Sequence, residues 1–228
     1  MSSLSFEIVG AEPDKYAATP IINFKLRITE ASGAEVHSVS LRAQIRIEPQ
    51  RRRYTHAEEE RLLALFGETP QWGQTLRPFL WSHAQMMVPG FTGTTEIDLP
   101  VNFSYDFEVA GAKYMHSLED GEIPLILLFN GTTFARTETG TLNVDPIAWN
   151  VESTYRLPVA TWRQMMDGFF PGCGWIRMRR DTLDALERYK TLGGYTTWES
   201  AFESLLKHAD AAEGADVVAA EIDVEDAV

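Results

Sequence analysis

The sequence predicts a mainly β protein of the α+β class, with an antiparallel β-sandwich-like body and a helical C-terminal appendage. Three observations predict it: apolar and polar residues alternate in the first half, Gly-containing turns separate the alternating segments, and helical spacing follows. We expect the body over residues 4–158, the appendage packed on it over 159–207, and an acidic, disordered tail over 208–228.

The first alternating segments are expected to form a hairpin. Residues 22–29 alternate without exception, and residues 39–47 repeat the pattern after a turn that contains Gly33. Such alternation places one side of a strand against the core and the other toward solvent. A strand over 4–9 should precede this hairpin.

Further strands are expected at residues 77–88, 97–107, 141–149 and 153–157. Pro100 indicates an edge or a bulge in the second of them, because proline cannot donate to a ladder. Asn130-Gly131 tolerates positive φ at both positions, so it predicts a tight hairpin turn after the apolar run 123–129.

Helix starts are indicated by capping patterns. In Thr55-His-Ala-Glu58 the hydroxyl and the carboxylate can each satisfy a free backbone amide, so a short helix should follow and end near Gly67. The later helices are expected to start at a second capping box, Thr161–Gln164, at Asp181 and at Thr196.

Composition restricts the function. The 228 residues carry a net charge of −13, from 33 acidic and 20 basic residues, which disfavours general nucleic-acid binding. The single cysteine excludes an internal disulfide. Residues 1–7 do not resemble a signal peptide, and the longest apolar stretch is far shorter than the ~20 residues of a membrane helix. We expect a cytoplasmic protein with neither nucleic-acid partner nor membrane insertion.

No catalytic motif is recognisable. The nucleophile elbow, the phosphate-binding loop, the dinucleotide fingerprint and the His-Glu-x-x-His zinc motif are all missing, and the five histidines are scattered. We therefore expect no catalytic residue, no metal site and no cofactor. Cys173 has two interpretations. It is either a small apolar residue in a glycine turn, which is favoured, or a thiolate activated by nearby arginines.

Basic side chains form the first candidate site. On the expected hairpin, Lys25, Arg27, Arg42 and Arg46 would share the outward side, and Arg51, Arg52 and Arg53 would extend it. Such a face could dock an acidic protein or an anionic group. The alternative is that these bases pair across the sheet with nearby carboxylates, namely Glu48, Glu96, Asp98 and Asp106.

Aromatic residues form the second candidate. The segment 72–91 is poor in charge and rich in large side chains, among them Trp72 and Trp81. Exposed, it would be an apolar surface for a protein partner. Buried, it would only fill the sandwich. Both interpretations stay open at this level.

Several segments resemble a known family. They include Arg77-Pro-Phe-Leu-Trp-Ser-His, Pro124-Leu-Ile-Leu-Leu-Phe-Asn-Gly-Thr and Phe170-Pro-Gly-Cys-Gly-Trp. Together they resemble an uncharacterised, mainly actinobacterial domain-of-unknown-function family, from the first strand to about residue 207. The resemblance implies genes that lie beside those of NiFe-hydrogenases and their maturation proteins, and hence an accessory or assembly role. It supplies no catalytic residues.

Two functions follow as expectations. The first is a non-catalytic accessory or binding protein, an assembly or maturation factor whose protein partner is a hydrogenase subunit or another maturation factor. The second is a small enzyme or ligand-binding protein with a site between the sandwich and the helical appendage. A pocket with converging polar groups would favour the second, and a basic or apolar patch the first.

Overall fold

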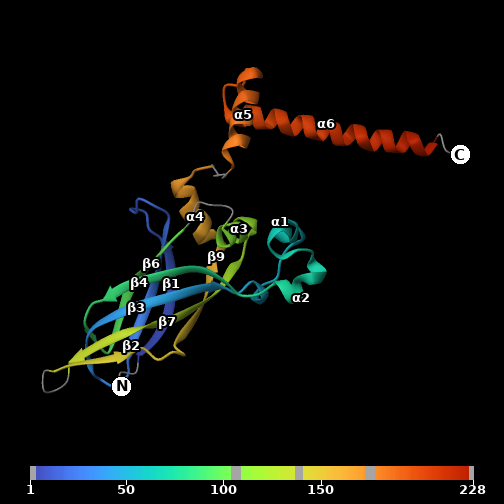
Figure 1. Ribbon diagram of the computed structural model, residues 1–228. Helices are drawn as coiled ribbons and strands as arrows, with labels where there is room; N and C mark the ends of the chain where they lie inside the picture. Colours follow the sequence, from blue (N-terminus) through green and yellow to red (C-terminus); the bar gives the residue numbers. More distant parts are fainter. Residues whose placement is uncertain (1–3, 104–108, 137–140, 173–177, 226–228) are drawn as a thin grey trace. The chain divides into compact units, whose positions relative to one another are not determined.

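The computed structural model describes residues 4–103, 109–136, 141–172 and 178–225. It divides into two compact units, one up to Ile176 and one from Arg177 onward. Cys173 lies outside the described residues. The predicted fold class is confirmed, since the first unit consists of two antiparallel sheets in an open, sandwich-like arrangement (Figure 1).

The first sheet has three strands in the order β1-β2-β6, namely β1 (Leu4–Pro13), β2 (Ile21–Glu30) and β6 (Thr94–Asn102). The main path of the second sheet is β4-β3-β7-β8, namely β4 (Phe79–Val88), β3 (Glu35–Ile47), β7 (Glu122–Arg136) and β8 (Leu142–Pro146). Its two side strands are β5 (Phe91–Thr92), which pairs with β3, and β9 (Glu152–Pro158), which pairs with β7.

Alternation predicts the buried faces of β2 and β3 correctly. Phe24 and Leu26 of β2 and Leu41, Ala43 and Ile45 of β3 are buried, while the residues that alternate with them are not. The two sheets meet through such side chains, because they belong to one hydrophobic core. Burial of this apolar area from water is the main force that holds the two layers together.

The expected hairpin between residues 22–29 and 39–47 is wrong. Strand β2 pairs with β1 and β6, and β3 pairs with β4, β5 and β7, so the two strands belong to different sheets. Alternation specifies which face of a strand is buried, but not which strand lies beside it. Here the chain crosses from one sheet to the other after Glu30, and both apolar rows still reach the shared core.

The expected hairpin turn at Asn130-Gly131 is also wrong, because β7 runs through it without a break. Gly131 has a φ of 144° and lies opposite Leu41 in the ladder with β3. A Cβ atom at this position would collide with the carbonyl oxygen of Ser40. The glycine therefore permits a close approach between two strands and does not form a turn.

Helices of the first unit fill the connections between strands. The segments in chain order are η1 (Pro49–Arg51), α1 (His56–Phe66), η2 (Thr69–Gln71), α2 (Trp72–Thr75), α3 (Ala110–Ser117) and α4 (Val159–Phe169). In Figure 1, α1, α2 and α3 gather at one end of the strands. The capping box that starts α1 is confirmed, and α1 ends at Gly67, whose φ is 71°.

The second predicted capping box is wrong. Helix α4 begins at Val159, directly after β9, with Pro158 at its N-cap position and no side-chain cap. Its buried residues, Trp162 and Met165 among them, belong to the core of the sandwich. The compact units consequently divide after Ile176, whereas the sequence placed a boundary between residues 158 and 159.

The second unit contains α5 (Arg180–Leu192) and α6 (Trp198–Glu225). Hydroxyl groups of Tyr189, Tyr195 and Ser204 join the two helices, with Tyr195 Oη 2.6 Å from Ser204 Oγ. Asp181, the expected cap, lies in the first turn of α5, one residue after its start. Helix α6 continues into the segment 208–228, for which the sequence predicted disorder. Among the described helices, none combines the length and apolarity needed to cross a lipid bilayer.

Candidate functional site

Lys25 and Arg27 are paired on the outward side of the first sheet. Lys25 Nζ lies 2.8 Å from Asp98 Oδ1 and 2.7 Å from Glu12 Oε1. These contacts raise the pKa of Lys25, with the hydrogen bond to Asp98 as the largest cause. Arg27 pairs in the same way with Glu96 and Glu7. The cross-strand pairing that the sequence left open therefore holds for these two bases.

Arg42 and Arg46 lie on β3, in the other sheet. Arg46 Nη2 donates a long hydrogen bond of 3.4 Å to the carbonyl oxygen of Pro78. Arg42 is exposed, and its side chain has no hydrogen bond or ion pair within the described ranges. The single basic face predicted from the sequence is therefore wrong as geometry, because its members belong to two different sheets.

Trp72 and Trp81 are both half-buried and pack against the core. The indole Nε1 of Trp72 donates to the carbonyl oxygen of Gly67 at 2.9 Å. Trp81 lies against Phe103, with ring centroids 4.9 Å apart, and against the edge of Phe24. Their rings therefore contribute to packing within the first unit.

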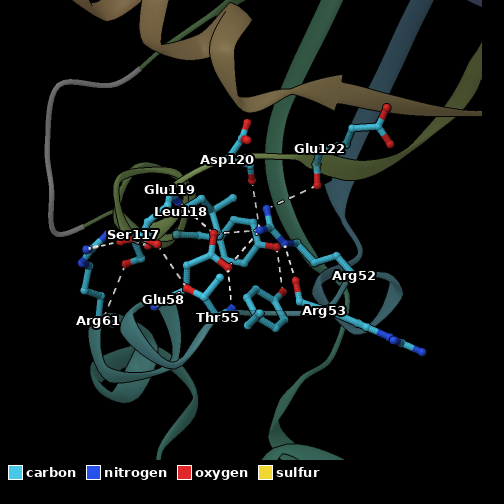
Figure 2. Close-up of polar contacts among 12 residues, drawn as sticks. Arg52, Arg53, Thr55, Glu58, Arg61, Ser117, Leu118, Glu119, Asp120 and Glu122 are labelled. Atoms are coloured by element: carbon cyan, nitrogen blue, oxygen red, sulfur yellow. Dashed lines mark hydrogen bonds and ion pairs between the residues drawn. The ribbon is translucent and has the colours of Figure 1, made fainter.

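Arg52 is the centre of a buried polar network (Figure 2). Its Nη2 donates to both carboxylate oxygens of Glu58, at 2.8 and 3.0 Å, and to the carbonyl oxygen of Asp120 at 3.2 Å. Its other nitrogens reach the carbonyl oxygens of Arg53 and Glu122. The side chains of Arg52 and Glu58 are only 9% and 1% exposed. The guanidinium of Arg52 therefore uses its hydrogen-bond donors within the protein and is not available to a partner.

Glu58 completes this network by accepting backbone hydrogen bonds. Its oxygens accept from the amides of Thr55, at 3.0 Å, and of Glu119, at 2.8 Å. Arg61 Nη2 in turn donates to Glu119 Oε1 at 2.7 Å, and Arg61 Nη1 to the carbonyl oxygen of Ser117. The network joins α1 to the connection between α3 and β7. It satisfies a buried carboxylate and a buried guanidinium together, as burial of such groups requires.

An open hollow of about 650 Å³ lies beside this network and is rich in arginine. We call it the arginine hollow; it is lined by Gln50, Arg51, Arg52, Arg53, Gly121, Glu122 and Arg156. A smaller hollow of about 390 Å³ shares Arg51 and Arg156 with it. Arg156 belongs to β9 and was missed from the sequence, because nothing in its local pattern indicates that β9 lies beside residues 51–53.

The exposed arginines of the arginine hollow differ in how they are paired. Arg51 Nε lies 3.2 Å from Glu48 Oε2, and Arg156 Nη1 lies 3.6 Å from Glu122 Oε2. The Arg156–Glu122 pair is exposed on both sides, so it contributes about 0–1 kcal/mol and is screened by salt, whereas the side chain of Glu48 is only 8% exposed. Arg53 points away from Glu58 (Figure 2) and forms no ion pair with any residue that the structure describes. The guanidinium groups of Arg53 and Arg156 can therefore exchange partners, while Arg51 stays with the buried carboxylate of Glu48.

Other titratable groups do not form a site. Among residues outside the undescribed gaps, no three His, Cys, Asp or Glu side chains lie close enough to hold a metal ion together. Burial, and secondarily the charge of Arg163, lowers the pKa of His116 to about 4. His116 lies edge-on to the ring of Trp162, with centroids 4.6 Å apart. This histidine is neutral at pH 7 and part of the packing.

Comparison with known proteins gives one family match and distant structural likenesses. The model of a "Family of unknown function (DUF6084)" matches residues 1–214. No curated protein matches the chain. The CARDB domain of the PF1109 protein from Pyrococcus furiosus, in complex with di-metal ions, aligns at 9% identity and a TM-score of 0.28 over 69% of this chain and 92% of its own.

A β-glucosidase from Kluyveromyces marxianus, whose structure is also known in complex with glucose, is similar over part of its length. It aligns with 68% of this chain but 15% of its own, at 9% identity and a TM-score of 0.23. The glucose complex aligns at 10% identity with the same TM-score of 0.23. At such TM-scores these likenesses carry no argument about function.

Proposed function

The chain belongs to the family of unknown function DUF6084, and on that premise we propose that it is a non-catalytic binding protein that captures acidic protein partners through its arginine hollow. The observation that carries this proposal is the group of three exposed guanidinium groups of Arg51, Arg53 and Arg156, of which Arg53 and Arg156 can exchange partners. They stand out on a chain whose net charge is −13. The proposed location is the cytoplasm.

The chemistry of arginine fits an acidic partner. A guanidinium presents several donors in a planar fork that matches a carboxylate and stays charged at any physiological pH. Arg53 has no ion pair among the described residues and Arg156 has only an exposed one, so a partner's carboxylates can bind both at little cost. Long-range attraction would then steer an acidic segment into the arginine hollow.

The finer form of this proposal is an accessory role in the assembly or maturation of a NiFe-hydrogenase. It is supported only by the family resemblance of the sequence. The partner would then be a hydrogenase subunit or a maturation protein with an acidic docking segment. Purification of the tagged protein from its native host, with partners identified by mass spectrometry, tests this form. Recovery of partners unrelated to hydrogenases would remove it and leave the general proposal intact.

The direct test uses two charge reversals of equal size. Arg53→Glu with Arg156→Glu changes the arginine hollow, and Arg42→Glu with Arg46→Glu changes β3 as a matched control. Binding of a labelled oligo-glutamate peptide is measured by fluorescence anisotropy at low and high salt. We expect the first variant to lose binding, and the wild type to lose it as salt screens the charges. The control should bind like the wild type.

Thermal melts of both variants establish that they fold. If the two variants bind the peptide equally well, the arginine hollow is not the docking site. If the control loses binding and the first variant keeps it, the docking site is on β3.

A further inference from the structure

A second hollow, of about 680 Å³, lies between strands of both sheets. Its walls come from β3, β4, β6 and β7, and β4 and β6 are end strands in the order of their sheets. We call it the polar hollow; its polar residues are Arg42, Gln44, His83, Gln85, Asn102 and Asn130. It shares no residue with the arginine hollow.

The ladder register explains why these side chains converge. Arg42 lies directly across from Gln85 on β4 and from Asn130 on β7. Gln44, two residues further along β3, lies across from His83. Directly opposed residues share a face of the sheet, so these five groups form one cluster on the outward side.

The polar groups of this hollow are unpaired. None of the six side chains forms a hydrogen bond or an ion pair with another residue in the described part of the chain. The outward row of β2 is different, because Asn23 donates to Asp14 at 3.2 Å and Thr29 lies 3.2 Å from the hydroxyl of Thr94. The polar hollow thus keeps its full capacity for hydrogen bonding to a ligand.

The kinds of group present define a ligand class. Four carboxamides can each donate and accept, which matches hydroxyl groups. Arg42 only donates and matches a carboxylate or a phosphate. No carboxylate lines the polar hollow, so a cation or an amine would find no counter-charge there. Its volume of about 680 Å³ is in the range of small-molecule sites, about 300–1,000 Å³.

We propose that the polar hollow binds a small hydroxylated organic anion. Arg42 holds its carboxylate or phosphate, and the carboxamides of residues 44, 85, 102 and 130 bind its hydroxyl groups. This binding is independent of the protein docking proposed for the arginine hollow, because the two sites have no residue in common. Failure of one proposal therefore leaves the other standing.

The test separates charge from hydroxyl groups with four probes. Gluconate and sorbitol 6-phosphate carry both features, sorbitol carries only hydroxyls, and hexanoate carries only a carboxylate. Backbone amide shifts in NMR spectra follow each titration. We expect the two hydroxylated anions to bind at least about tenfold more tightly than sorbitol or hexanoate, a difference of one bidentate charged contact. The shifted amides should belong to β3, β4 and β7.

Variants then locate the contacts. Arg42→Gln should remove the advantage of gluconate over sorbitol, and Asn130→Ala should weaken both. Arg188→Gln on α5, a residue that lines neither hollow, is the matched control and should change neither. The proposal is overturned if no anionic probe gives saturable shifts, if hexanoate binds as well as gluconate, or if Arg42→Gln leaves the affinities unchanged.

Discussion

Arg52 and Arg53 are neighbours in the sequence and opposites in the structure. The Arg52 side chain is 9% exposed and donates five hydrogen bonds, whereas Arg53 is exposed and forms no ion pair in the part of the chain described. The difference arises because Arg52 faces α1 and the connection between α3 and β7. A basic residue is thus available to a partner only where the fold leaves it exposed and without a buried carboxylate as its partner.

The outward rows of β2 and β3 repeat this comparison at the level of strands. Both rows alternate in the same way along the sequence. The row on β2 lies between two acidic strands, β1 and β6, which neutralise Lys25 and Arg27. The row on β3 lies between β4 and β7, which place amides and an imidazole beside Arg42. The same alternation therefore gives ion-paired bases in one sheet and, among the described residues, bases without ion pairs in the other.

The largest effect is expected when the ion pair between Arg52 and Glu58 is broken. Arg52→Met leaves the carboxylate of Glu58 buried without its counter-charge, and we expect a loss of about 3–5 kcal/mol in the free energy of unfolding. Arg53→Met is the matched control and should stay within about 0.5 kcal/mol of wild type. Urea denaturation measures both. Equal midpoints for the two variants would show that the Arg52 network does not stabilise the fold.

The buried His116 is expected to make the stability of the fold depend on pH. The fold lowers the pKa of His116 to about 4, so it excludes a proton that the unfolded chain takes up below about pH 6.5. The free energy of unfolding therefore carries no penalty from His116 above pH 6.5, and it decreases as the pH falls from 6.5 toward 4 because the unfolded chain binds the proton first. His116→Gln should flatten the fall of the unfolding midpoint between pH 6.5 and 4. Parallel curves for wild type and His116→Gln would contradict the shift.

A smaller effect on the melting temperature is expected when the charges of the basic residues on β2 or β3 are reversed. Lys25→Glu with Arg27→Glu places new carboxylates beside four existing ones and should lower the melting temperature by several degrees. Arg42→Glu with Arg46→Glu changes the charge equally but meets no carboxylate partner in the described structure, so its melting temperature should stay near that of wild type. Calorimetry at low salt compares them. A larger loss from the β3 reversal would invert the comparison.

The smallest effect is expected at the C-terminus. The segment 208–228 contains seven acidic residues and no Lys or Arg, and it lacks Phe, Trp and Tyr. Removal of everything after Lys207 should therefore leave the melting temperature nearly unchanged, even though α6 extends to Glu225. A drop of several degrees would show that this segment packs on other residues.

The sequence by itself determined the local features of this protein. Alternation identified the strands and their buried faces, since a side-chain period of two follows from strand geometry alone. The capping box at Thr55 and the helix end at Gly67 were predicted for the same reason, because a cap involves residues only a few positions apart. The sequence assigned Arg52 only to a group of basic residues, and its buried contacts with Glu58 were not among the local features.

Only the tertiary structure decided which strands are neighbours, and with them the candidate sites. It placed β2 and β3 in different sheets, kept Asn130-Gly131 inside β7, and brought Arg156 beside Arg51 and Arg53. Each of these outcomes depends on contacts between residues far apart in the sequence. The alternation of a strand is the same whichever strand lies next to it, so the partner of each charge is decided by the packing of the sheets and not by the local pattern.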